Sequence, residues 1–149
     1  MTTQPDTELD RIERSIDIDA SAEKVWALIA RPGWWINEQE VDPDPVIRQE
    51  SEDTAVVVHE KWGEFTLRTV GSDEPRYLAY RWIEADSAGT LVEFWIDERP
   101  GGVTLRVVES GLTELGKEHD DLVRHFEDNS EGWELELQAA LRFVTGTTG

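Results

Sequence analysis

Apolar and polar residues alternate from Ile12 to Asp19, which is the pattern of a β-strand with one buried face. Ser21 then stands in the N-cap position of a segment that has one apolar side, so we expect a short helix that ends at Pro32-Gly33. Trp34 and Trp35 follow in an irregular segment or a single turn. The opening of the chain is therefore predicted to be strand, helix and a tryptophan-bearing loop.

Five runs of β-branched and aromatic residues fill the middle of the chain, at residues 55–59, 65–70, 77–83, 91–97 and 103–108. Turn-forming residues separate the runs, so neighbouring strands are predicted to pair antiparallel. Side-chain parity predicts one polar face and one apolar face. The apolar set is Phe65, Leu67, Leu78, Tyr80, Trp82, Val92, Phe94, Ile96, Val103, Leu105 and Val107.

The apolar period becomes helical after Gly111. A first stripe is interrupted at residues 128–130, and a second stripe runs from Trp133 to Val144. Asp128 and Glu131 have capping-box spacing, so we expect the final helix to begin there and to end at Gly146.

These elements predict an α+β fold in which a curved antiparallel sheet of about six strands wraps around a long C-terminal helix. One or two short helices follow the first strand. Residues 12–146 are expected to form a single domain, and residues 1–11 a flexible N-terminal tail, because no linker or repeat divides the chain.

The charge of the chain narrows the choice of partners. Asp and Glu total 33 against 14 Lys and Arg, which gives a formal net charge of −19. Such a field repels phosphate backbones and anionic bilayers, so neither nucleic acid nor a membrane is an expected partner. The chain has no cysteine, no apolar run long enough to span a bilayer and no visible export signal, so we expect a cytoplasmic protein.

Four segments together resemble a known superfamily: residues 16–28, Trp34-Trp35, residues 75–82 and residues 131–133. They resemble the helix-grip proteins of the SRPBCC/START superfamily, which includes the birch-pollen allergens and polyketide cyclases. Within it, the chain is similar to the bacterial single-domain relatives of the activator of heat-shock protein 90 ATPase. The resemblance implies binding of hydrophobic or lipid-like ligands and a link to stress response, but no universal catalytic residue and no cofactor.

The seven tryptophans are the most informative excess in the composition. Several of them fall where the predicted sheet meets the final helix, so we expect a ligand cavity there, although the same rings could simply fill the core. The candidate cavity residues are Trp34, Trp35, Phe65, Leu67, Tyr80, Trp82, Phe94, Trp133 and Leu137.

Other chemistry has weak support in the sequence. His119 and His125 lie on different faces of a helix, so no metal site is expected, and solvated histidines are the favoured interpretation. Glu60 and Glu64 are candidates for acid–base work, but close carboxylates arise by chance in so acidic a chain.

Three functions remain open: a non-enzymatic module that binds a small apolar or aromatic molecule, a co-chaperone of a heat-shock protein 90, and a cyclase or hydrolase of the polyketide type. The last requires ionisable side chains inside the cavity. A monomer and a homodimer are both compatible with the sequence.

Overall fold

The computed structural model describes residues 9–37, 40–42, 44–84, 87–115 and 117–146. Strand β1 (Arg11–Ile18) and helix α1 (Ala22–Ile29) open the fold. Six further strands follow: β2 (Val46–Gln49), β3 (Thr54–His59), β4 (Gly63–Asp73), β5 (Tyr77–Glu84), β6 (Ser87–Arg99) and β7 (Gly102–Ser110). A 3-10 helix, η2 (Leu112–Leu115), leads into the long helix α2 (His119–Thr145).

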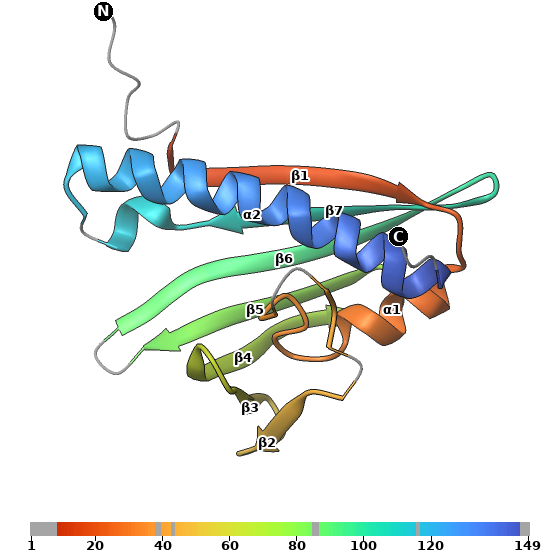
Figure 1. The fold of residues 1–149 in the computed structure, drawn as a ribbon, viewed down its shortest axis with the longest axis horizontal. Coiled ribbons are helices and arrows are strands. Elements are labelled where there is room, and N and C mark those ends of the chain that lie inside the picture. The colour runs from red at the N-terminus through yellow and green to blue at the C-terminus, as the bar shows by residue number, and fades with distance from the viewer. Residues whose placement is uncertain (1–8, 38–39, 43, 85–86, 116, 147–149) are drawn as a thin grey trace, which may run out of the picture.

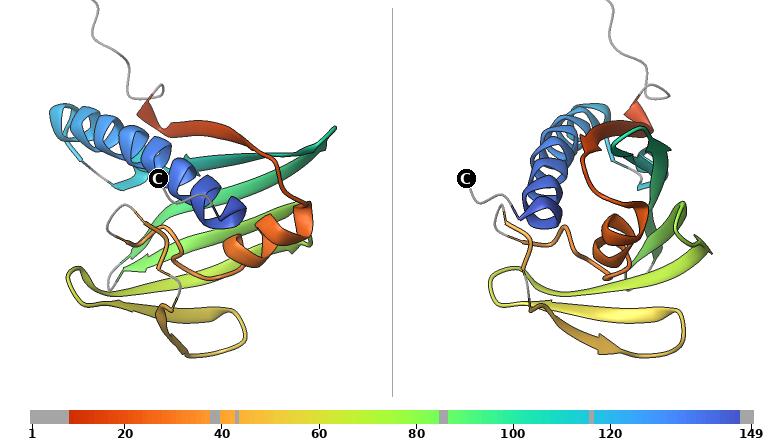
Figure 2. Two further views of the ribbon diagram at one scale, coloured as in Figure 1. Left: turned by 45° about the vertical axis from the view of Figure 1, so that its right-hand side comes forward. Right: turned by 90° about the vertical axis from the view of Figure 1, so that its right-hand side faces the viewer.

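The described strands form one antiparallel sheet in the order β1-β7-β6-β5-β4-β3-β2. The sheet bends around α2 and α1, which lie against its concave face (Figures 1 and 2). The predicted α+β helix-grip fold is confirmed. The sheet has one strand more than the sequence suggested, because β2 pairs with β3 through only four residues directly after the Pro-containing segment.

Local signals place the first elements as predicted. Ser21 caps α1, its side-chain oxygen accepting a hydrogen bond from the backbone N–H of Lys24 at 3.2 Å. The inward side of α1, which includes Val25, Leu28 and Ile29, is buried against the sheet. Residues 1–8 of the predicted tail lie outside the described residues, and Leu9 is buried.

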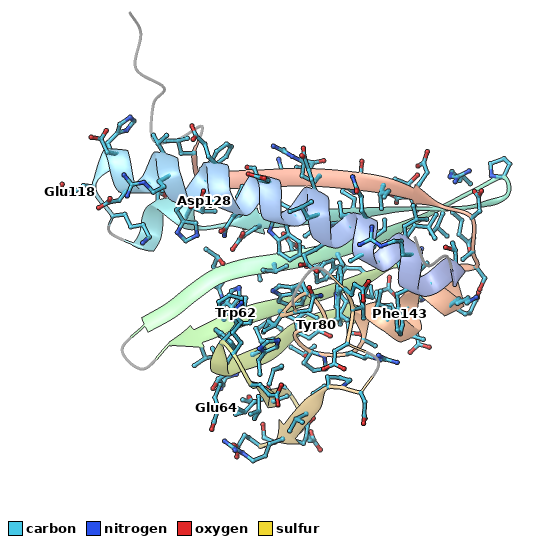
Figure 3. The ribbon with its side chains drawn as sticks, in the orientation of Figure 1. Trp62, Glu64, Tyr80, Glu118, Asp128 and Phe143 are labelled. Carbon is cyan, nitrogen blue, oxygen red and sulfur yellow. The ribbon has the colours of Figure 1, made fainter. Side chains whose placement is uncertain are left out.

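The predicted start of the final helix is wrong. Helix α2 begins after Glu118 and runs unbroken through Asp128, whose place within the helix is visible in Figure 3. Two of the three polar residues 128–130 have side-chain partners in the helical conformation. Ser130 donates to the carbonyl of Phe126 at 2.6 Å, and Asn129 donates to Glu109 of β7 at 3.0 Å. The predicted end is confirmed, since Gly146 takes a left-handed conformation with φ of 72°.

The parity of the sheet is also confirmed. The inward residues of the central strands are almost completely buried, including Leu78 and Tyr80 on β5, Phe94 on β6 and Leu105 on β7. Phe65 and Trp82, which belong to the same face, are only half-buried. In the described part of the chain, no helix is long and apolar enough to cross a membrane.

Candidate functional site

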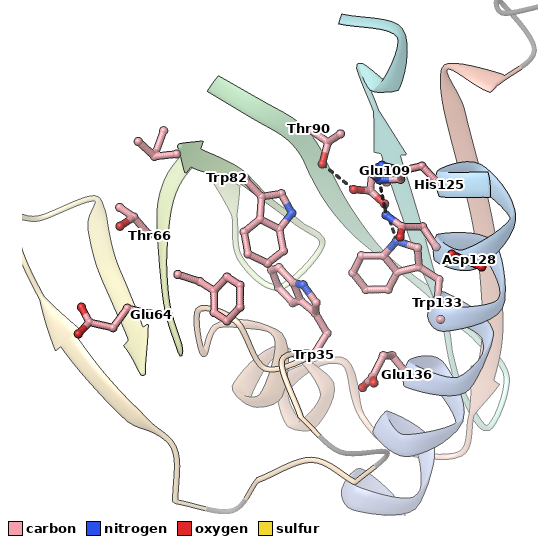
Figure 4. Close-up of a pocket in the computed structure, with 14 residues that line it drawn as sticks. Trp35, Glu64, Thr66, Trp82, Thr90, Glu109, His125, Asp128, Trp133 and Glu136 are labelled. Carbon is pink, nitrogen blue, oxygen red and sulfur yellow. Dashed lines mark hydrogen bonds between the residues drawn. The ribbon is translucent and has the colours of Figure 1, made fainter. Parts of the chain in front are cut away.

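A cavity of about 770 Å³ lies between α2 and strands β4 and β5 (Figure 4). Its volume falls in the range of small-molecule sites, which is about 300–1,000 Å³. The loop after α1 contributes Trp35, the start of β6 contributes Thr90, and the end of β7 contributes Glu109. The cavity therefore forms where the bent sheet and α2 diverge, at the place that the sequence predicted for a ligand.

One wall of the cavity is aromatic. Trp35 stands between Trp82 of β5 and Trp133 of α2, with ring centroids 5.7 and 5.6 Å away. Phe65 of β4 packs edge-on against Trp82 at 5.7 Å. Trp35, Phe65 and Trp82 are half-buried, so each keeps part of its surface available to a molecule in the cavity.

The other predicted cavity residues pack behind this wall and are not among the lining residues. These residues belong to the packed interior and are each at most 4% exposed: Trp34, Leu67, Tyr80, Phe94 and Leu137. The Tyr80 hydroxyl donates to the carbonyl of Ile29 at 2.7 Å, which fixes α1 against β5. Burial raises the pKa of Tyr80, so its hydroxyl stays a donor at neutral pH.

A polar wall adjoins Trp133 and centres on Glu109, which is only 3% exposed. Its Oε1 accepts from Nδ2 of Asn129 and from Nε1 of Trp133, each at 3.0 Å. Its Oε2 accepts from the hydroxyl of Thr90 at 2.5 Å. Three neutral donors thus hold a buried carboxylate at the edge of the cavity, as Figure 4 shows.

Strand parity could have revealed this polar wall. Glu109 lies two residues beyond Val107, and Thr90 two residues before Val92, so both continue the inward face of their strands. The inward face predicted from the sequence included only apolar residues, so it began at Val92 on one strand and ended at Val107 on the next. A polar residue in the inward register is therefore the signal that identifies this wall.

Helix α2 lines the cavity with residues at helical spacing, namely His125, Asp128, Asn129, Gly132, Trp133 and Glu136. His125 was expected in solvent, but its Nε2 lies 3.0 Å from Nδ2 of Asn129 at the cavity. Gly132 faces open space, because a Cβ built there meets no atom within 4 Å. The middle of the helix therefore leaves room that a side chain would otherwise fill.

Glu136 is the second desolvated carboxyl group of the cavity. Its Oε1 accepts from Nδ2 of Asn37 at 2.8 Å. Burial raises the pKa of Glu136 to about 7, and the hydrogen bond from Asn37 and the charge of Arg142 oppose this shift. The group can therefore gain or lose a proton near neutral pH inside a cavity, which is a property shared with general acids and bases.

Two further carboxylates border the cavity closer to solvent. Asp128 is exposed on α2, and Glu64 of β4 pairs with Arg48 at 3.1 Å. Within the described ranges, no three His, Asp or Glu side chains form a group that could hold a metal ion. The arrangement is that of an amphipathic binding cavity, with an aromatic wall and an acidic wall.

Comparison with known proteins shows similarity to solved structures. No protein-family model and no curated protein sequence matches the chain. Protein MLL2253 from Mesorhizobium loti matches 93% of this chain and 99% of its own, with 19% identity and a TM-score of 0.67. The Aha1 dimer from Colwellia psychrerythraea matches 93% of this chain and 98% of its own, with 16% identity and a TM-score of 0.69.

CalU16 from Micromonospora echinospora is also similar, with 18% identity and a TM-score of 0.60 over 93% of this chain and 76% of its own. The TM-scores of these three matches establish a common fold. The low sequence identities leave the ligand and the reaction open. The chain therefore shares the helix-grip α+β fold of these bacterial proteins.

Proposed function

We propose that this protein binds a small, partly aromatic molecule in the cavity between α2 and strands β4 and β5. The observation that carries the proposal is the combination of an open volume of about 770 Å³ with the half-buried rings of Trp35 and Trp82 on its wall. Rings that only filled a core would be closed over, as Trp34 is at 3% exposed. The polar wall around Glu109 orients the bound molecule.

The expected affinity is modest. Burial of roughly 300 Å² of ligand surface contributes on the order of 7 kcal/mol at about 25 cal/mol/Å². Association costs at least about 4 kcal/mol, so dissociation constants from micromolar to millimolar follow for a purely apolar molecule. Hydrogen bonds to the polar wall would lower the dissociation constant further.

The neutral fluorescent probe N-phenyl-1-naphthylamine tests the proposal. Its emission rises when it enters an apolar site, and we expect saturable binding to the wild-type protein. The Gly132→Leu variant places a side chain in the open space beside Gly132 and should abolish the saturable signal. Gln138→Leu adds a leucine at an exposed position of the same helix and serves as the matched control.

Saturable binding that persists in Gly132→Leu would contradict the proposal, because the probe would then bind elsewhere. Unchanged far-UV circular dichroism in both variants ensures that a lost signal reports the cavity rather than a lost fold.

A second candidate function is acid–base catalysis on a bound ketone or ester, as in a polyketide cyclase or hydrolase. Its specific support is that ionisable groups line the cavity, with Glu136 titrating at about pH 7 beside the aromatic wall. A panel of aryl β-diketones and aryl esters tests it. Turnover that disappears in Glu136→Gln would support this candidate, and the absence of turnover with every member of the panel would remove it.

A co-chaperone role rests on similarity alone, namely to the Aha1 dimer of Colwellia psychrerythraea. A bacterial heat-shock protein 90 whose ATPase rate rises on addition of this protein would support that role. An unchanged rate together with a negative pull-down would dismiss it. Light scattering on the same preparation would separate a monomer from a homodimer.

A further inference from the structure

The charged side chains that line the cavity define which molecules can enter it. Glu109 and Glu136 lie inside, and Asp128 and Glu64 lie near solvent. Among the described residues of the lining, none is lysine or arginine. The oxygens of Glu109 are engaged by three neutral donors, whereas Glu64 pairs with Arg48 and the charge of Arg142 acts on Glu136 from outside the lining.

The aromatic wall has the composition that favours cations. Three tryptophans border the cavity, and the centroids of Trp82 and Trp133 both lie within 6 Å of the Trp35 ring, at 5.7 and 5.6 Å. The electron-rich face of tryptophan is the strongest aromatic partner of a cation, effective within about 6 Å of the ring centroid. Trp35, Trp133 and Glu136 all line this cavity, and Figure 4 shows Glu136 below Trp133 on α2, so rings and carboxylate border one space.

We propose that the molecule bound in this cavity carries a positive charge, as an amine or quaternary ammonium group held between the tryptophan rings and Glu136. The inference deepens the proposed function and rests on it. Burial of a carboxylate is unfavourable unless an opposite charge accompanies it. Arg142 already acts on Glu136, and the ligand adds a second positive charge inside the cavity. The apolar part of the ligand contacts Phe65 and Trp82.

The electrostatic field of the whole molecule also favours a cationic ligand. With a net charge of −19 the protein attracts cations and repels anions, and a cavity bordered by carboxylates concentrates that field. An acidic surface alone would attract any cation weakly and without saturation. The cavity adds a desolvated carboxyl group and ring faces at one place, so binding should saturate and should depend on Glu136.

Benzyltrimethylammonium and its neutral isostere neopentylbenzene form a matched pair of probes, with 4-tert-butylbenzoate as the anionic member. Titrations followed by tryptophan fluorescence at pH 8 in 0.15 M salt keep Glu136 largely ionised, since its pKa is about 7. We expect the cation to bind about tenfold more tightly than the neutral isostere, the gain typical of a cation–π contact with a desolvated ring. The anion should not bind.

The Glu136→Gln variant assigns the effect to one side chain. It should lower the ratio of the two affinities by about fivefold, because an interaction between two charges at the cavity is lost. Glu131→Gln removes the same charge from an exposed position of α2 and should leave the ratio within about twofold. Lowering the pH from 8 to 6 should weaken binding of the cation, because Glu136 becomes protonated.

The groups that face Glu136 are Asn37 from the loop, Arg142 on α2, and His125, Asp128, Glu109 and Glu64 around the cavity. His125→Gln therefore accompanies the pH series, and the response to pH should persist in it.

The outcomes separate the two proposals. Equal binding of cation and neutral isostere would overturn the charge inference and leave the proposed function intact. Binding of neither probe, together with no binding of N-phenyl-1-naphthylamine, would overturn both. An equal loss of selectivity in Glu136→Gln and Glu131→Gln would trace the preference to overall charge and would also overturn the inference.

Discussion

Glu109 shows how a single polar residue in the inward register shapes this site. It sits where the hydrophobic series of β7 would place another valine, and it is nearly as buried as its neighbours. The free-energy cost of removing its side chain from water is offset by hydrogen bonds from Thr90, Asn129 and Trp133, and the last two lie on α2. Glu109 therefore links the C-terminal end of β7 to the middle of α2.

Replacement of Glu109 by leucine tests this link. The N–H donors of Asn129 and Trp133 would lose their acceptor at a position removed from water, so we expect a loss of about 2–4 kcal/mol in the free energy of unfolding. Urea denaturation measures it. Glu98→Leu, at an exposed position of β6, should change stability by less than about 0.5 kcal/mol. Equal stabilities of the two variants would show that the hydrogen bonds contribute nothing.

Glu136 makes the stability of the protein depend on pH. The folded state holds its proton up to about pH 7, whereas the ordinary pKa is 4.5, so the unfolded state releases the proton first. Between these values the unfolded state binds fewer protons, and the free energy of unfolding falls as pH rises, by up to about 3 kcal/mol. Below about pH 4.5 both states are protonated and the contribution is complete.

Glu136→Gln should therefore be more stable than the wild type at pH 8, and the difference should vanish at pH 4. Thermal or urea unfolding at several pH values measures it, with Glu131→Gln as the exposed control. A difference that does not change with pH would show that Glu136 is ionised normally in the folded protein.

At the scale of elements, the glycine inside α2 and the glycine that caps its C-terminus have opposite effects. Gly132 has helical backbone geometry with open space beside it, and Gly146 ends the helix with φ of 72°. Gly132→Ala should raise stability by about 1 kcal/mol through helix propensity. Gly146→Ala should lower it by about 1 kcal/mol, because alanine is strained in the left-handed region. Urea denaturation of the two variants compares them, and a stability change of the same sign in both would contradict this account.

The sequence predicts most of the elements because their signals are local. Ser21 marks the start of α1, Gly146 marks the end of α2, and strict alternation identifies the inward face of β5 to β7. The start of α2 was misplaced because residues 128–130 resemble a cap. In the structure Ser130 bonds to the carbonyl of Phe126 within the helix, and Asn129 bonds to Glu109 of β7. Contacts of that kind join residues about 20 positions apart and have no local pattern.

The candidate site was predicted in part for the same reason. Aromatic residues of one parity indicate a common face, so the interior side of the sheet could be named, including Phe65 and Trp82 of the cavity wall. Parity cannot tell a ring that borders the cavity from one packed behind it, as Phe94 is, because that depends on where α2 leaves the sheet. The raised pKa of Glu136 could not be predicted from the sequence, because it results from burial of the side chain in the folded chain.

At the scale of the whole molecule, the charge of −19 opposes folding by self-repulsion. The ion pairs among the described residues lie mostly at the surface, such as Arg76 with Asp73 and Arg99 with Asp19, where a pair contributes little to stability. We therefore expect the melting temperature to rise as salt screens the repulsion, by roughly several degrees between 0.05 and 1 M. Differential scanning calorimetry measures it, and a melting temperature that does not change with salt would contradict the account.

The central claim is that the cavity between α2 and β5 is open to a small aromatic molecule, and the indole N–H signals in a ¹⁵N–¹H spectrum test it most directly. Trp35, Trp82 and Trp133 line the cavity, whereas Trp62 lies exposed at a turn and Trp95 packs under Arg106 outside it. On titration with N-phenyl-1-naphthylamine, the signals of the first three should shift and saturate together while those of Trp62 and Trp95 stay in place. Shifts confined to Trp62 and Trp95, or no shift in any indole signal, would contradict it.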